Sequence, residues 1–266
     1  MPLRVFVVFH DRLEENCYAH LSPLEFEMIT FVAVRPDLPK RYNRARFTNV
    51  VNEWELPTYD PSLQARGYKE ASVLWHLRHN NMYAPEDVVL LLQWDMVLQG
   101  HALAGVLAGF QDAMPMCNVV VPYAQFRLCV PEEVVAAVQH MLDTKSGHVH
   151  SEQELAACQY PMCQLYTVRG AVLTRLLDWT MSPDMLAYID RVSADESLWV
   201  GKASLASNSR AAQAMEHAMA MAVGVTFRTG RGCPWVALWH PCSHTLSDVP
   251  PAMRDLCAPV FALRER

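Results

Sequence analysis

Short apolar runs alternate with amphipathic stretches along the first part of the chain. The runs 3–9, 28–34 and 88–95 are rich in β-branched, aromatic and leucine residues and each ends in polar residues, which is typical of buried strands. Residues 14–24 are long enough for a crossover connection, so we expect the first two runs to pair in parallel. Apolar residues at helical spacing predict a helix over 67–80.

The pattern continues with further helices and short strands, interrupted by two polar segments. Segment 36–61 is rich in proline and basic residues and predicts a long surface loop, and 144–154 predicts a flexible loop. The remaining expected elements are helices at 100–110, 131–142, 171–179 and 207–223 and strands at 119–122, 165–168 and 235–239, the last closing the sheet or packing on its edge. Together they predict an α/β fold with a mostly parallel central sheet flanked by helices on both faces.

Length and composition narrow the class of protein. A chain of 266 residues with 52% hydrophobic and 19% charged residues can bury a large core, and we expect one compact domain over 1–266. Its apolar runs are too short for an integral membrane segment, and the first run is too short and too soon charged for a signal peptide, so a cytoplasmic location is expected. The net charge of −6 disfavours nucleic acid as a partner.

Eight cysteines without a CxxC pair predict mostly reduced, buried thiols. Two clusters mix histidine and cysteine at short spacing and are weighed as zinc sites. They are His148 and His150 with Cys158 and Cys163, and Cys233 with His240, Cys242 and His244. Neither has the spacing of a zinc finger, ribbon or knuckle, so a zinc-stabilised, non-catalytic binding module is the alternative hypothesis for the protein.

The most informative segment is 88–96, where an apolar run leads directly into Gln93, Trp94 and Asp95. Ligands of open α/β sheets bind at the carboxyl ends of the strands, which makes Asp95 a site candidate by position. A carboxylate there suits a divalent cation bridging the phosphates of a nucleotide. The alternative is an aspartate that caps the following helix.

The strings Tyr-Lys-Glu-Ala-Ser at 68–72 and Leu-Trp-His-Leu at 74–77, followed by Gln-Trp-Asp-Met at 93–96, resemble a known family. They are similar to nucleotide-sugar glycosyltransferases of the GT-A type from large algal viruses and bacterial capsule clusters. The resemblance is close over 56–96 and loose over 1–240. It implies a GT-A-like (Rossmann-like) domain with a nucleotide-binding half (1–96), an acceptor half (97–250) and a tail (251–266).

The resemblance also implies a donor site. Gln93 and Asp95 occupy the position of the family's D-x-D segment, although the first Asp is replaced by Gln. His10 and Asp11 follow the first strand, where the family has a histidine in the nucleotide-base pocket. Arg210 corresponds to a basic residue of a family helix.

Metal and base candidates complete the expected site. Asp95 would bind a divalent cation, Mn²⁺ or Mg²⁺, and His240 or His244 would complete its shell from the C-terminal side. The acceptor hydroxyl requires a carboxylate base, for which Glu216 and the pair Asp195–Glu196 are candidates. Adjacent acids such as Asp195 and Glu196 are also common as helix caps.

These residues predict a metal-assisted glycosyltransferase (EC 2.4 class) that moves a hexosyl or pentosyl group from a UDP- or GDP-linked nucleotide sugar to a carbohydrate hydroxyl in glycan biosynthesis. Glycoside hydrolysis is disfavoured because no acids are paired at strand ends. A Rossmann dehydrogenase is disfavoured because no GxGxxG follows the first strand.

Overall fold

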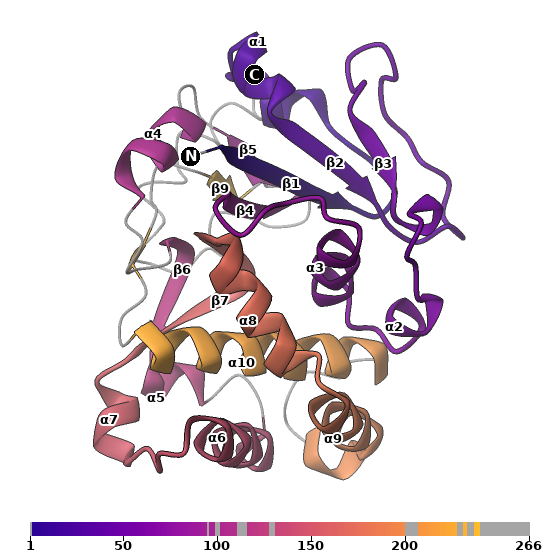
Figure 1. The fold of residues 1–266 in the computed structure, drawn as a ribbon. Coiled ribbons are helices and arrows are strands. Elements are labelled where there is room, and N and C mark those ends of the chain that lie inside the picture. Colours follow the sequence, from indigo (N-terminus) through magenta and orange to yellow (C-terminus); the bar gives the residue numbers. More distant parts are fainter. Residues whose placement is uncertain are drawn as a thin grey trace.

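A computed structural model describes residues 2–94, 96–98, 102–110, 116–127, 131–199, 207–227, 231–232 and 237–239. Within these residues the chain forms a seven-stranded sheet in the order β3-β2-β1-β4-β7-β6-β8 and a two-stranded sheet of β5 and β9 (Figure 1). All strands of the larger sheet run in the same direction except β7, which is antiparallel to both of its neighbours. The expected α/β class and the mostly parallel sheet are therefore confirmed.

The strands follow the apolar runs of the sequence. They are β1 (Leu3–Phe9), β2 (Ile29–Ala33), β3 (Val50–Asn52), β4 (Val88–Gln93), β5 (Met96–Leu98), β6 (Met116–Pro122), β7 (Gln159–Arg169), β8 (Arg231–Gly232) and β9 (Ala237–Trp239). The parallel pairing of the first two runs is confirmed, with Val5 opposite Ile29 and Phe9 opposite Ala33.

Helices cover both faces of the sheet (Figure 1). They are α1 (Pro23–Glu27), α2 (Pro61–Ala65), α3 (Glu70–His79), α4 (Ala102–Gly109), α5 (Tyr123–Phe126), α6 (Glu132–Ser146), α7 (Glu152–Ala156), α8 (Gly170–Thr180), α9 (Pro183–Ala194) and α10 (Ser207–Phe227), with 3-10 turns η1 (Glu15–Tyr18), η2 (Glu53–Glu55) and η3 (Glu196–Trp199). None of the helices in this described part combines the length and the apolar character that a bilayer-spanning segment needs.

The alternation of side chains along β1 divides the core into two layers. Phe6 and Val8 point to the face that is packed by α3, α6, α8, α9 and α10. Val5, Val7 and Phe9 point to the opposite face, which is packed by η1, α1 and α4. Because successive strand residues face opposite sides, a strand buried on both faces reads as a continuous apolar run.

Three sequence expectations are corrected. Segment 36–61 is not a plain loop, because β3 extends the sheet in parallel and η2 follows it. The stretch 144–154 is largely helical, since α6 continues to Ser146 and a Ser151–Glu154 capping box starts α7. Residues 237–239 pair with β5 in the small sheet instead of extending the large one.

Candidate functional site at the carboxyl edge of the sheet

The strand order reverses between β1 and β4. From β1 the chain builds outward to β2 and β3, then returns through α2 and α3 to place β4 on the other side of β1. The crevice outside the carboxyl ends of the strands at such a reversal is where open α/β sheets bind ligands. His10 directly follows β1, and Gln93 ends β4 opposite Val8, so the structure brings these two predicted site residues to the same edge.

His10 is held as a neutral imidazole at this edge. Burial, and after it the positive charges of Lys69 and Arg35, lower the pKa of His10 from 6.5 to about 4. The ring is therefore uncharged at neutral pH and offers one donor and one acceptor nitrogen. Lys69, Arg35 and Lys40 thus place positive charge near His10, opposed in part by Asp11.

Lys69 has an uncommon backbone conformation. Its φ is 48° and its ψ is −116°, and the amide of Ala71 donates to the carbonyl of Tyr68 at 3.1 Å. This is the geometry of the first central residue of a type II′ turn, a position that glycine normally occupies. A lysine there costs on the order of 1–3 kcal/mol, and such strain is concentrated at functional sites. The turn leads directly into α3, whose amino terminus faces the same edge and favours negative charge.

A second strained cation follows β2. Arg35 has φ 65°, although it precedes Pro36 and the left-handed region is unfavourable for such a residue. Its guanidinium pairs with Asp37 at 2.7 and 2.9 Å, and Lys40 Nζ donates to the Arg35 carbonyl at 2.6 Å. Burial lowers the pKa of Lys40. The turn over 35–40 thus adds two cations near His10.

Asp11 connects the end of β1 to the segment after β2. Its carboxylate accepts from the Arg41 guanidinium at 2.7 Å, and its carbonyl accepts from the Arg41 amide at 2.7 Å. Next to it, the guanidinium of Arg12 lies 4.9 Å from the ring centre of Trp94. The Trp94 carbonyl in turn accepts from the Tyr18 hydroxyl at 3.2 Å. Asp11 therefore fastens the 36–47 segment across the end of β1.

Gln93 contributes an oxygen to the site. Its amide nitrogen donates to Glu70 Oε1 at 3.3 Å, which leaves the Gln93 carbonyl oxygen for another partner. Glu70 is buried, with 8% of its surface exposed, and opens α3. Amide and carboxylate oxygens are the ligands that Mg²⁺ and Mn²⁺ prefer, so these residues suit such a cation. Asp95, His240 and His244 lie outside the described residues.

A buried polar cluster joins the segment after β3 to α3. Glu53 and His76 are 1% and 0% exposed, and Glu53 Oε1 lies 2.7 Å from His76 Nδ1. The other ring nitrogen, Nε2, accepts from the Asp60 amide at 2.9 Å, so Nδ1 carries the proton and donates to Glu53. Glu53 Oε2 accepts from Gln64 at 2.7 Å. The cluster fastens the segment between β3 and α2 onto α3.

The remaining predicted residues form a separate group around α9 and α10. Arg210 is buried and donates to the Ser193 carbonyl at 2.8 Å and to Glu196 at 3.2 Å. Asp195 ends α9 and accepts from the amide and the hydroxyl of Ser197 at 3.0 and 2.6 Å. Glu216 is half-buried in the middle of α10, as expected. The contacts of Asp195 are those of a cap, whereas Arg210 and Glu196 join α10 to η3.

No family model, curated protein or solved structure matches this chain. In the part of the chain that the structure describes, no three His, Cys, Asp or Glu side chains gather around a point where a metal ion would fit. Of the cysteines, Cys17 and Cys158 are buried, as expected.

Sequence reasoning missed the cations at this edge. Lys69 lay in the string that carries the family resemblance, yet it was assigned no role. Lys40 lies in the predicted surface loop, and the run 28–34 ends at Arg35. The available signal was a basic residue two positions after Gly67, where a helix starts, and another directly before Pro36, where a buried strand ends.

Proposed function

We propose that the protein is a glycosyltransferase of the GT-A type that moves a sugar from a nucleotide diphosphate to a carbohydrate hydroxyl. The observation that carries the proposal is the carboxyl edge of the sheet at the β1–β4 reversal, where Lys69 and Arg35 lie near neutral His10 and Gln93 contacts the first residue of α3. A diphosphate is an anion that such charges and helix amides bind, and the carboxyl edge is the usual nucleotide position.

Different residues at the carboxyl edge bind different parts of the donor. Lys69 and Arg35 neutralise phosphate charge, while His10 offers neutral hydrogen bonds to the base or ribose. Gln93 and Glu70, with Asp95 after them, are oxygen donors for Mn²⁺ or Mg²⁺. A divalent cation bound there would neutralise the departing diphosphate. Since the first Asp of the family motif is Gln93, we assign a larger share of that neutralisation to Lys69 and Arg35.

Transfer also requires a base for the acceptor hydroxyl. As the bond between the sugar carbon and the diphosphate oxygen breaks, the hydroxyl oxygen forms the new bond and its proton passes to a carboxylate. Among the candidates, Asp195 is engaged as a cap, and the side chain of Glu196 is 82% exposed and paired with Arg210. Glu216, half-buried in the middle of α10, is the third candidate, and loss of turnover with donor binding intact in Glu216→Gln would identify it as the base.

Ligand binding provides the first test. The full chain is screened against UDP- and GDP-sugars by thermal unfolding, with Mn²⁺, with Mg²⁺ and with EDTA. A ligand at 100 times its Kd stabilises the native state by about 2.7 kcal/mol. Stabilisation by a nucleotide sugar, followed by transfer or slow hydrolysis, supports the proposal. A tightly held zinc ion without any nucleotide-sugar binding supports the binding module instead.

Substitutions locate the site. Asp95→Asn is expected to abolish transfer without changing the melting temperature, and Gln93→Ala to weaken donor binding by a smaller factor, since a neutral hydrogen bond contributes about 1 kcal/mol. Glu86→Gln is the matched control, because Glu86 is exposed just before the opposite end of β4. Full activity with unchanged metal dependence in Asp95→Asn would refute this assignment of the site.

A further inference from the structure

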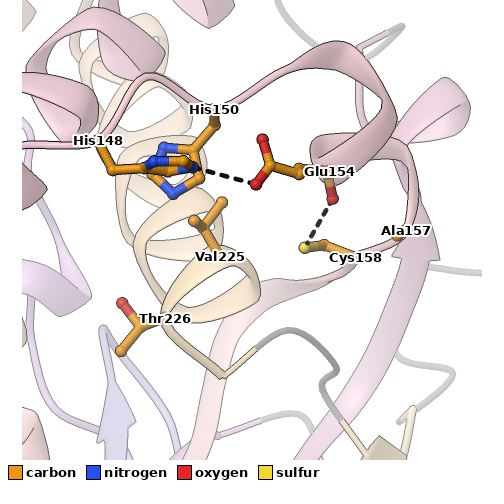
Figure 2. A pocket seen from close by; sticks show the side chains of 7 residues that line it. All are labelled: His148, His150, Glu154, Ala157, Cys158, Val225 and Thr226. Atoms are coloured by element: carbon orange, nitrogen blue, oxygen red, sulfur yellow. Dashed lines mark hydrogen bonds and ion pairs between the residues drawn. The ribbon is translucent and has the colours of Figure 1, made fainter.

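Two histidines and a glutamate line a pocket far along the chain from the crevice at the β1–β4 reversal. His148 and His150 lie in the connection between α6 and α7, and Glu154 lies on α7. Figure 2 shows them around a cavity of about 350 Å³, together with Ala157, Cys158 and the α10 residues Val225 and Thr226. No step of the proposed transfer uses this pocket.

His150 is held in the orientation of a metal ligand. Its Nδ1 lies 2.6 Å from Asp143 Oδ1, its amide donates to the same oxygen at 3.1 Å, and its carbonyl accepts from Gln139 at 3.0 Å. An ionised carboxylate only accepts hydrogen bonds, so Nδ1 donates to Asp143 and Nε2 is the ring nitrogen that can bind an ion. A carboxylate behind an imidazole is the usual outer partner of a metal-binding histidine.

His148 and Glu154 supply a second and a third donor beside it. His148 Nε2 lies 3.0 Å from Glu154 Oε1, and the ring centres of His148 and His150 are 4.7 Å apart. Bonds of about 2.1 Å to a tetrahedral ion place neighbouring ligand atoms about 3.4 Å apart and two imidazole centres about 5 Å apart. Glu154 Oε2 accepts hydrogen bonds from the amide and the hydroxyl of Ser151, both at 2.8 Å, so Oε1 is the oxygen that faces His148.

We propose that His148, His150 and Glu154 form a binding site for a transition-metal ion of the Zn²⁺ class. Two imidazoles and one carboxylate favour Zn²⁺, Ni²⁺ or Cu²⁺ over Mg²⁺, which prefers oxygen ligands. The described side chains do not surround one point, so the ion replaces the His148–Glu154 hydrogen bond through rotation of the His148 side chain, which is 57% exposed. Glu154 stays in its capping box with Ser151 through Oε2 and offers Oε1 to the ion.

The cysteine of the pocket is outside the ligand set. Cys158 is buried and its thiol donates to the Glu154 carbonyl at 3.3 Å. Three protein ligands leave a fourth position for water or another small ligand. Binding ties the α6–α7 connection to α7 and stabilises this corner of the fold, independently of donor binding at the carboxyl edge.

The test uses the full chain, stripped with EDTA and dialysed, and titrated with ZnCl₂ by calorimetry and thermal unfolding. We expect a Zn²⁺ site whose Kd rises at least tenfold in His148→Ala and in His150→Ala. Asp143→Asn is expected to weaken it ten- to a hundredfold, because it removes the outer partner of His150. His140→Ala, an exposed histidine on α6, and Cys158→Ala are the controls and keep the wild-type Kd.

Three results would overturn the site. They are the absence of Zn²⁺ binding in the wild type, a wild-type Kd in both histidine variants, and equal affinity for Mg²⁺. Circular dichroism of each variant separates lost binding from lost folding, and Asp143→Asn, which removes no ligand, provides a second measurement. Nucleotide-sugar binding of His148→Ala stays at the wild-type level, so a failure of this site is distinguishable from a failure of the proposed function.

Discussion

Replacing Lys69 separates backbone strain from charge at the candidate donor site. Lys69→Gly removes the ammonium group and relieves the φ of 48° and ψ of −116°, whereas Lys69→Ala removes the ammonium group and keeps the strain. We expect the two variants to bind ligand equally weakly and to differ in stability. The difference between their free energies of unfolding measures the backbone conformational contribution alone, because neither glycine nor alanine carries a charge.

The size of each effect follows from the structure. A non-glycine residue in this region costs about 1–3 kcal/mol, and the greater freedom of glycine in the unfolded chain offsets about 0.4–1 kcal/mol. Lys69→Gly should therefore be more stable than Lys69→Ala by about 0.5–2 kcal/mol. Loss of one charge-assisted hydrogen bond to phosphate, about 1.5–3 kcal/mol, raises the Kd for a nucleoside diphosphate by about ten- to 150-fold in both variants.

Urea unfolding measures the stability difference, and calorimetry with UDP and GDP measures binding. Lys145→Ala is the control, since Lys145 is exposed in the last turn of α6 and is expected to change neither quantity. Equal stability of the glycine and alanine variants would show that the turn at Lys69 is not strained. Unchanged diphosphate affinity in both would remove Lys69 from the donor site.

Two further predictions concern buried polar groups near the crevice. Since the pKa of His10 is about 4 in the native state and 6.5 in the unfolded chain, the unfolded chain binds more protons between these values, and stability is lost as the pH falls from 6.5 towards 4. The loss of stability is at most about 3 kcal/mol, and it is smaller to the extent that solvent reaches the ring. To check this, the free energy of unfolding of His10→Gln and of the wild type is measured at several pH values. We expect it to change less with pH in the variant. His76→Ala leaves the Glu53 carboxylate buried without its imidazole and should lower the free energy of unfolding by about 3–5 kcal/mol. Glu53→Gln keeps an acceptor for Nδ1 and should lower it less. An equal loss of stability in urea unfolding would contradict the assigned proton position.

The sequence alone determined the strands that are buried on both faces. Runs 3–9, 28–34 and 88–95 were recognisable because every residue of such a strand is apolar, and helix 67–80 because one face of it packs on the core. The sequence did not predict β3, because its three residues are half-buried at the sheet edge and form no apolar run. It also missed α9, despite a serine cap and a proline in its first turn.

The location of the candidate site was partly within reach of the sequence. An acid after a buried strand pointed to the end of β4, and a histidine after the first strand pointed to the end of β1. The ends of β1 and β4 lie side by side because these strands pair in parallel. The sequence predicted a mostly parallel sheet but not that these two strands are neighbours. The cap at Asp195 is a local contact with Ser197, and the sequence offered it as an alternative. The sequence could not show that Arg210 pairs with Glu196, because this contact joins α10 to η3 through tertiary packing.

The charge of the crevice was decided only by the tertiary structure. Lys69, Arg35 and His10 come from three different connections, and each is an ordinary polar residue in its own segment. Local patterns record whether a residue is buried or exposed, but not which distant residue lies beside it. The neutral state of His10 arises from burial and from those neighbours together, so it exists only once the sheet has brought the ends of β1 and β2 and the start of α3 to one edge.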